Sequence, residues 1–259
     1  MTASKLAPGA PRGLAPAGPF PKDHPWDRNF FLAWVGLIWL GIGLGFGPEL
    51  VQHVAKHEKP FEPIVHVHGA FFVGWLVLLT AQVLLVRSQR IATHRRLGLA
   101  MVGWGAAMLV LGPAVAWVRQ RHEFGTPLSD PGFFSIQLID ILSFAVLGGA
   151  GVLLRRHASA HKRLMLIATL CIADAGYARF IGPLLEKAYG KAFWPDYVGV
   201  FGVTGLLIVG IGVYDLITRR RLHPAYLAGA AWGLAGQAVA VFLWFNPAWL
   251  AFTTRLFHP

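Results

Sequence analysis

The sequence predicts an all-α membrane protein, a polytopic helix bundle that crosses the bilayer about seven times. Three observations favour this class. Only 14% of the residues are charged, whereas soluble domains carry about 25% charged residues. Long apolar runs recur along the chain, and a helix needs roughly 20 apolar residues to cross the hydrocarbon. These runs lack the two-residue alternation of membrane β-strands, and only helices satisfy their backbone polar groups within one segment.

The expected elements follow in chain order. Residues 1–28 are rich in Pro, Ala and Gly and lack the apolar core of a signal peptide, so we expect a disordered cytoplasmic tail. Residues 29–250 are expected to form the transmembrane domain, and residues 251–259 a short external tail. The expected spans are residues 30–47, 65–86, 97–118, 133–154, 164–185, 197–217 and 225–244.

Basic residues are concentrated in alternate links between these spans. The links after the second, fourth and sixth spans are strongly basic, as in Arg87, Arg155 and Arg219, whereas the other links mix both signs of charge. The positive-inside rule therefore predicts a cytoplasmic N-terminus and an external C-terminus. This distribution explains most of the formal charge of +11, so the expected partner is the lipid bilayer and no nucleic acid is expected.

Small residues and the single cysteine indicate packing rather than chemistry. Gly41, Gly43, Gly45 and Gly47 give overlapping G-x-x-x-G spacings in the first span, which are typical of close helix packing. Cys171 is the only cysteine and lies in an apolar segment, so the chain forms no intrachain disulfide.

One set of ionisable residues lies toward the outer face. Ionisable groups within a span are costly and usually face the bundle interior. Asp140 and Arg179 lie at matching depth on sequential antiparallel helices, so an ion pair between them is expected. With His68 and Asp174 they predict a polar pocket that opens to the outside. The alternative is that the ion pair only fixes the register of the two helices.

Histidines gather toward the inner face. His94 begins the third span, and His157 and His161 precede the fifth span with i,i+4 spacing, which places both rings on one helix face. A b-type haem needs one histidine from each of two helices, with basic side chains to meet its propionates. His94 and His161 are the expected pair. The candidate propionate partners are Arg95, Arg96, Lys162 and Arg163.

Two other interpretations of these histidines stay open. They are candidate ligands of a non-haem metal; that set is His94, His157, His161 and His68, with Asp215 as an oxygen ligand. They are equally consistent with histidines that merely meet lipid phosphate groups. Gln82 and Asp215 lie at a similar inner depth and join the candidate polar residues, although an interhelical hydrogen bond also explains Gln82.

Three short strings carry a resemblance to known proteins. They are His66-Val67-His68-Gly69, His94-Arg95-Arg96-Leu97-Gly98 and His161-Lys162-Arg163-Leu164-Met165. Together with Trp75 and Gln82 they resemble a group of uncharacterised bacterial multi-pass membrane proteins, over about residues 63–165. The resemblance implies a location in the bacterial cytoplasmic (inner) membrane.

A more distant likeness is to the b-type membrane cytochromes of the ascorbate-dependent and ferric-reductase kind. In those proteins, antiparallel helices carry histidine ligands for two haems, one near each membrane face. The resemblance implies an inner pair of His94 and His161. The outer pair is incomplete, because His68 has no histidine opposite and the fourth span offers Asp140 instead. This departure leaves one haem or none.

Three hypotheses for function follow. The leading one is a haem b or metal protein with a redox role, which exchanges electrons with a quinol or another small donor. The second is a proton-coupled transporter or small-molecule binding protein that uses the outer pocket. The third is a structural or assembly subunit. The sequence leaves open whether the chain is an enzyme, which would then be a membrane oxidoreductase, and it does not set the oligomeric state.

Overall fold

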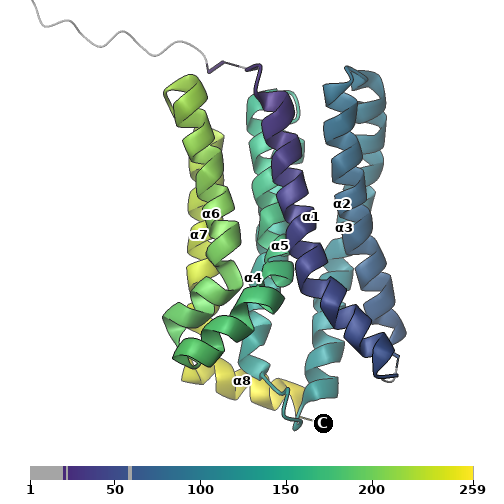
Figure 1. Cartoon of the computed structure of the whole chain (residues 1–259), viewed down its shortest axis with the longest axis vertical. Coiled ribbons are helices and arrows are strands. Elements are labelled where there is room, and N and C mark those ends of the chain that lie inside the picture. Colours follow the sequence, from purple (N-terminus) through teal and green to yellow (C-terminus); the bar gives the residue numbers. More distant parts are fainter. Residues whose placement is uncertain (1–19, 22, 58–59, 259) are drawn as a thin grey trace, which may run out of the picture.

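The protein is described here by a computed structural model that covers residues 20–21, 23–57 and 60–258. The secondary structure of these residues is entirely helical (Figure 1). The helices are α1 (Asp27–Ala55), α2 (Pro63–Arg87), α3 (Ile91–Glu123), the 3₁₀ helix η1 (Pro131–Phe133), α4 (Phe134–Leu153), α5 (Ala158–Tyr189), α6 (Phe193–Arg219), α7 (Pro224–Trp244) and α8 (Pro247–Phe257). The helices α1 to α7 are long and apolar enough to cross a membrane, if η1 is counted as part of the α4 span. The predicted fold class is therefore confirmed.

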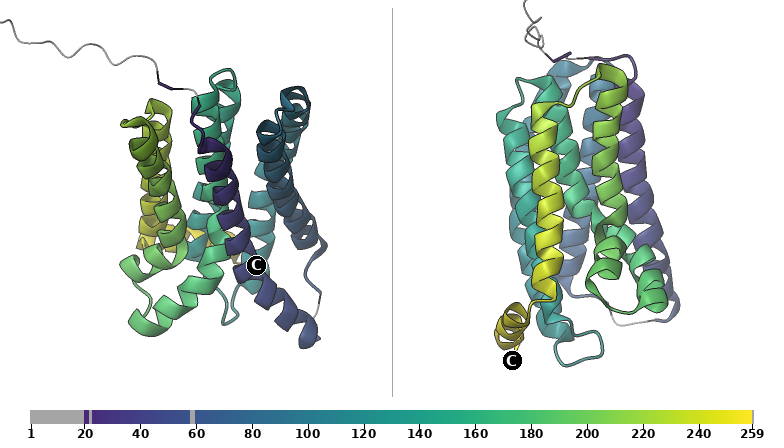
Figure 2. Two further views of the ribbon diagram at one scale, coloured as in Figure 1. Left: turned by 45° about the horizontal axis from the view of Figure 1, so that its top comes forward. Right: turned by 90° about the vertical axis from the view of Figure 1, so that its left-hand side faces the viewer.

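The seven long helices run side by side, and α5 lies at their centre (Figures 1 and 2). It packs against α1, α4, α6 and α7, while α2 and α3 form a pair on one side of the bundle. Accordingly, α5 is the most deeply buried span. The exposed large hydrophobic residues on the other helices fit contact with lipid, because no water-facing surface is needed there.

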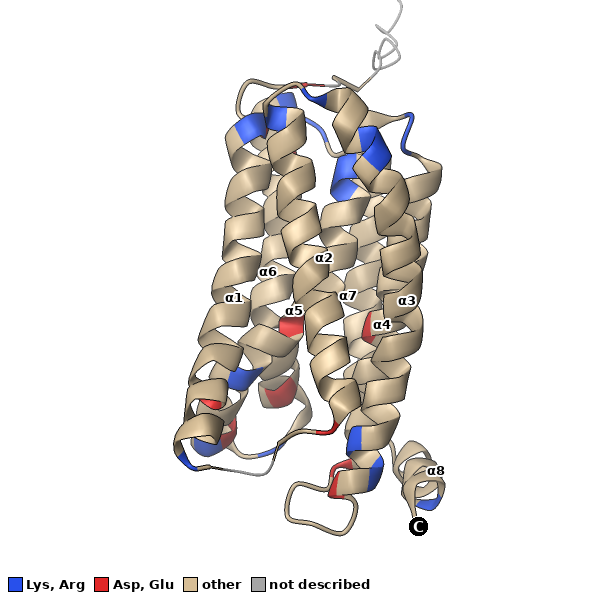
Figure 3. Ribbon diagram, turned by 90° about the vertical axis from the view of Figure 1, so that its right-hand side faces the viewer, with Lys and Arg blue, Asp and Glu red and all other residues tan. Residues whose placement is uncertain are grey.

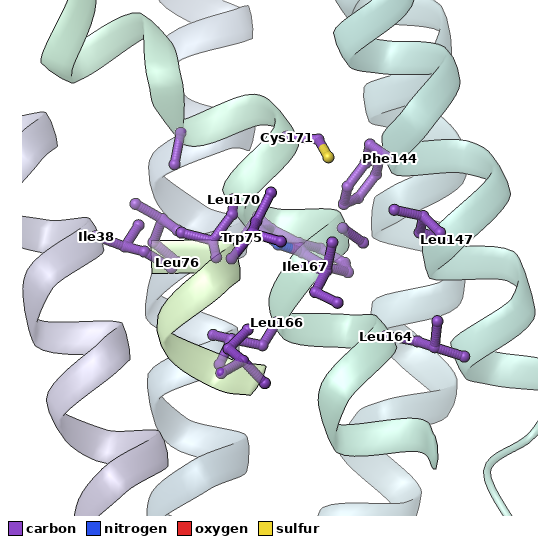
Figure 4. Packing of buried hydrophobic residues seen from close by; sticks show 14 of the residues in the cluster. Ile38, Trp75, Leu76, Phe144, Leu147, Leu164, Leu166, Ile167, Leu170 and Cys171 are labelled. Atoms are coloured by element: carbon purple, nitrogen blue, oxygen red, sulfur yellow. The ribbon is translucent and has the colours of Figure 1, made fainter. Parts of the chain in front are cut away.

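The main apolar core surrounds α5 (Figure 4). Ile167 and Leu170 of α5 are fully buried beside Trp75 of α2 and Phe144 of α4. The indole Nε1 of Trp75 donates a hydrogen bond to Oγ1 of Thr169 at 3.2 Å, so its polar group is satisfied inside the core.

Glycines bring α1 and α5 into backbone contact. A Cβ on Gly45 would overlap the carbonyl of Gly176, and a Cβ on Gly176 would lie 2.6 Å from the carbonyl oxygen of Gly41. A Cβ on Gly43 or Gly47 would meet nothing within 4 Å. Of the overlapping G-x-x-x-G spacings, the structure therefore uses Gly41 and Gly45 for helix packing.

The C-terminal segment forms a helix where the sequence analysis placed a short tail from residue 251. α8 lies across the end of the bundle that is remote from the N-terminal segment (Figure 1). Asn246 caps it by accepting hydrogen bonds from the backbone N–H groups of Ala248 and Trp249 at 2.9 and 3.1 Å. Asn followed by Pro at the first helical position is a helix start signal, which a search for spans does not use.

Charge separates between the two ends of the bundle (Figure 3). Lys and Arg gather where the N-terminal segment and the links after α2, α4 and α6 lie; we call this the basic end. The opposite end carries both signs, and α8 lies there. The three basic links predicted from the sequence therefore do share one end.

Candidate functional site

Two histidines from separate helices meet at the basic end. His94 lies in the first turn of α3 and His161 in the first turn of α5. Their ring centres are 6.3 Å apart and the ring planes are 81° apart. The structure therefore brings together the pair that the sequence analysis selected.

A hydrogen bond fixes the tautomer of His161. Its Nδ1 lies 2.8 Å from the carbonyl oxygen of Gly151, in the last turns of α4. A carbonyl oxygen only accepts, so Nδ1 carries a proton, and the neutral ring then has its lone pair on Nε2. Metal-bound histidines typically donate their second ring nitrogen to a carbonyl or carboxylate in this way. His161 is thus held in the form that a metal ligand needs.

Unsatisfied polar atoms lie beside this pair. Among the described residues, Nδ1 of His94 and Oε1 of Gln82 are buried without a hydrogen-bond partner. The two residues are adjacent, because the imidazole of His94 is within hydrogen-bonding reach of the backbone of Gln82. Gln82 is 6% exposed, and its Nε2 donates to the sulfur of Met101 at 3.3 Å. Buried orphan atoms are uncommon in folded proteins and indicate a water or ligand.

The ring separation also fits a shared metal ion. Two metal–nitrogen bonds of about 2.0 Å, each extended by the distance from nitrogen to ring centre, span about 6 Å. Haem needs only these two protein ligands, since the porphyrin supplies the others. A non-haem metal site needs more than two protein ligands. The part of the chain that the structure describes contains no group of three or more His, Cys, Asp or Glu residues that could hold a metal ion.

The other proposed metal ligands lie apart from the pair or are engaged elsewhere. His157 is exposed at the N-cap of α5. His68 lies in the first turns of α2, toward the opposite end, where its ring packs at a tilt against Phe72 with 4.0 Å between ring centres. Asp215 forms ion pairs with Arg163 and Arg219. Arg163 and Lys162 were both candidate propionate partners. Arg163 is engaged by Asp215, and Lys162 donates to Asp27 at 2.6 Å. Arg95 and Arg96 are exposed at the basic end.

A buried ionic network occupies the basic end between α1, α5 and α6. Arg163 and Asp215 are both 0% exposed. Arg219 donates to both carboxylate oxygens of Asp27, at 2.8 and 2.7 Å, and the hydroxyl of Tyr214 donates to Asp27 at 2.6 Å. The sequence analysis missed Asp27 by assigning residues 1–28 to a tail. Its side-chain partners Lys162, Tyr214 and Arg219 lie more than 130 positions away along the chain, so no local pattern links them.

The outer set of polar residues is arranged differently from the prediction. The expected ion pair between Asp140 and Arg179 is wrong, because Nε of Arg179 donates to Glu49 of α1 at 2.7 Å. The carboxyl group of Asp140 instead lies close enough to that of Asp174 on α5 for the two to interact. Figure 3 shows acidic positions at mid-height on both α4 and α5. The α1 helix extends past residue 47 through Pro48, which brings Glu49 within reach of Arg179.

These two carboxyl groups belong to a polar cluster inside the bundle. Asp174 is 2% exposed and Asp140 is half-buried, and neighbouring carboxylates inside a bundle repel one another. Arg179 acts electrostatically on both His68 and Asp174. The predicted outer residues therefore do lie in one region.

The fold and these sites define a polytopic α-helical membrane protein with polar groups in its interior. Comparisons of the chain with protein-family models, with curated proteins and with solved structures find no match.

Proposed function

We propose that this protein is a redox protein of the bacterial cytoplasmic membrane that binds one haem b between His94 and His161. A single observation carries the proposal: the two imidazole rings meet edge to face from α3 and α5, with their centres 6.3 Å apart, and Nδ1 of His161 is engaged by a backbone carbonyl, so that the neutral ring has its lone pair on Nε2. The unpartnered Nδ1 of His94 supports it. The haem supplies one-electron oxidation and reduction when it is bound.

The protein side chains then have distinct parts. Gly151 accepts from Nδ1 of His161, which orients the ring and raises its basicity as a ligand. Of the four candidate propionate partners, Arg95 and Arg96 are the two that are exposed. Lys162 and Arg163 hold the helices together through Asp27 and Asp215 instead.

The proposal includes the orientation of the protein. The basic end faces the cytoplasm by the positive-inside rule, so the histidine pair lies near the inner face. A quinol or another small donor dissolved in or beside the inner leaflet reaches this level of the membrane. It is the proposed electron donor or acceptor.

The test is a visible spectrum of the protein purified in mild detergent from cells supplied with haem, oxidised and then reduced with dithionite. We expect a Soret band with sharp reduced α and β bands. His94→Ala and His161→Ala should each abolish the Soret band, because each removes one axial ligand. The matched control is His157→Ala, which changes an exposed histidine four positions from His161 and should leave the spectrum unchanged.

The other outcomes separate the alternatives. The protein could be colourless and contain stoichiometric metal that both variants lose. That outcome would support a non-haem metal site in place of haem. A colourless, metal-free protein ends the redox proposal. We propose the second candidate, a proton-coupled transporter or small-molecule binding protein, on the basis of the Asp140–Asp174 pair. It predicts a colourless protein whose activity is lost in Asp174→Asn and varies with pH.

A further inference from the structure

Gln237 is a buried glutamine of α7 whose side-chain amide makes no hydrogen bond to the described part of the chain. It is 3% exposed, and both Nε2 and Oε1 are without a partner among the described residues. A Cβ on Gly205 of α6 would lie 3.7 Å from Oε1, so a group as small as a methyl fits beside the amide without a clash. An unsatisfied polar group costs several kcal/mol inside a membrane, and such a group indicates a bound water or ion.

Gln237 lies at the same level as Asp174 across the contact between α5 and α7. A Cβ on Gly233 of α7 would lie 3.5 Å from Sγ of Cys171 on α5, so these two residues face one another. Both helices begin at the basic end and run in the same direction. Gln237 follows Gly233 by one turn on the same helix face, a rise of about 6 Å, and Asp174 follows Cys171 by a rise of about 4.5 Å. The amide and the carboxyl group therefore lie about one turn beyond the same contact.

Helix α4 completes this site from a third side. A Cβ on Gly236, the residue before Gln237, would lie 3.2 Å from Oγ of Ser143 on α4. Ser143 is buried and lies one turn from Asp140 on the same face of α4. The carboxyl group of Asp140 in turn lies close to that of Asp174. Three helices thus bring two carboxyl groups, an amide and a hydroxyl to one level inside the bundle.

The two carboxyl groups have no cationic side chain as a direct partner. Among the described residues, neither Asp140 nor Asp174 forms an ion pair with a lysine, arginine or histidine. Arg179 acts electrostatically on Asp174, but its Nε donates to Glu49 at 2.7 Å, and those two charges balance one another. Even when one proton is shared between them, the two carboxyl groups keep one negative charge. Buried charges are paired or coordinate metals, so this charge favours a cation.

We propose that a sodium ion binds between α4, α5 and α7, with oxygen ligands from Asp140, Asp174, Gln237 and Ser143. Oxygen atoms are the ligands that hard cations prefer. One net negative charge matches a monovalent ion, whereas Ca²⁺ takes 6–8 oxygen ligands and Mg²⁺ keeps several waters. The ion satisfies the buried Oε1 of Gln237, and ionisable residues inside a span mark ion pathways. The proposal concerns binding alone and does not involve the histidine pair, so it stands or falls independently of the haem site.

The test compares thermal unfolding of the full chain in neutral detergent in sodium chloride and in choline chloride, at one pH and one ionic strength. We expect sodium to raise the unfolding temperature in a saturable way, and radiolabelled sodium to bind with a stoichiometry of a single ion per chain. Gln237→Met removes one ligand but keeps a similar volume, and it should raise the half-saturating sodium concentration about tenfold. Without sodium this variant should be at least as stable as the unsubstituted protein, because it removes an unsatisfied amide.

Two further variants separate this site from general effects of salt and of substitution. Gln82→Met makes the same change to a glutamine that is 6% exposed near the basic end, and it should leave the sodium response unchanged. Asp174→Asn keeps an oxygen atom but removes the negative charge, and it should abolish the response. Equal unfolding temperatures in sodium and choline overturn the proposal, and so do equal changes in Gln237→Met and Gln82→Met. A sodium response that survives in Asp174→Asn places the ion elsewhere and overturns the proposal as well.

Discussion

Arg163 and Asp215 form a completely buried ion pair between α5 and α6. Nε of Arg163 donates to a carboxylate oxygen of Asp215 at 2.7 Å, and neither side chain is exposed. Arg163 also donates to the carbonyl oxygen of Ser159 at 2.6 Å, one turn earlier in α5. The pair therefore ties the start of the central helix to the end of α6 at the basic end.

Removing one partner should destabilise the protein strongly. Asp215→Ala leaves a buried guanidinium without its main counter-charge, and such changes cost about 3–5 kcal/mol. The measurement is the free energy of unfolding in mixed micelles. The double variant Arg163→Met/Asp215→Leu removes both charges and should cost less than the single change. A double variant as unstable as Asp215→Ala would show that shape, and not charge, dominates this contact.

The glycines of α1 predict two opposite responses to the same substitution. Gly45→Ala places a methyl group against the backbone of Gly176, where nothing can move aside, so we expect a loss of at least about 2 kcal/mol. Gly43→Ala adds its methyl group to open space and gains helix propensity of up to about 1 kcal/mol. Thermal unfolding of both variants in detergent checks this. Equal stabilities would contradict the close contact between α1 and α5.

The sequence predicted the spans and the histidine pair because both depend on local patterns. Hydropathy locates each span, and the strings around His94 and His161 mark two helix starts at one end of the bundle. The sequence did not predict which charged residues pair with one another. Arg179 was assigned to Asp140 by depth alone, but depth does not say which face of a helix a side chain occupies. Glu49 reaches Arg179 only because α1 continues past Pro48, beyond the end of its apolar run.

The carboxyl pair predicts a protonated acid inside the bundle at neutral pH. The carboxyl groups of Asp140 and Asp174 lie close together inside the bundle, and we expect them to share one proton, because this removes the repulsion between two negative charges. Infrared spectra of the protein in detergent should contain the C=O band of a protonated carboxylic acid. The double variant Asp140→Asn/Asp174→Asn should lose this band. Asp130→Asn should keep it, because Asp130 lies at the end of the bundle and accepts hydrogen bonds from Lys191 and Trp244. A band that survives in the double variant would assign it to another residue.

His223 predicts a loss of stability in mild acid. It lies in the link before α7, where its Nδ1 accepts a hydrogen bond from the N–H of Ala225 at 3.0 Å. Burial, followed by the nearby charge of Arg163, lowers the pKa of His223 below its ordinary value of 6.5. The folded state then binds fewer protons than the unfolded state, so this contribution to stability is complete above pH 6.5 and declines as the pH falls below it. His223→Asn keeps a cap acceptor but does not titrate. Its unfolding temperature should therefore fall less than that of the unsubstituted protein between about pH 8 and pH 5.

The control His57→Asn changes an exposed histidine at a positive φ of 52°, which Asn tolerates, and should keep the original pH profile. Identical profiles for the His223 variant and the unsubstituted protein would show that another group causes the acid sensitivity.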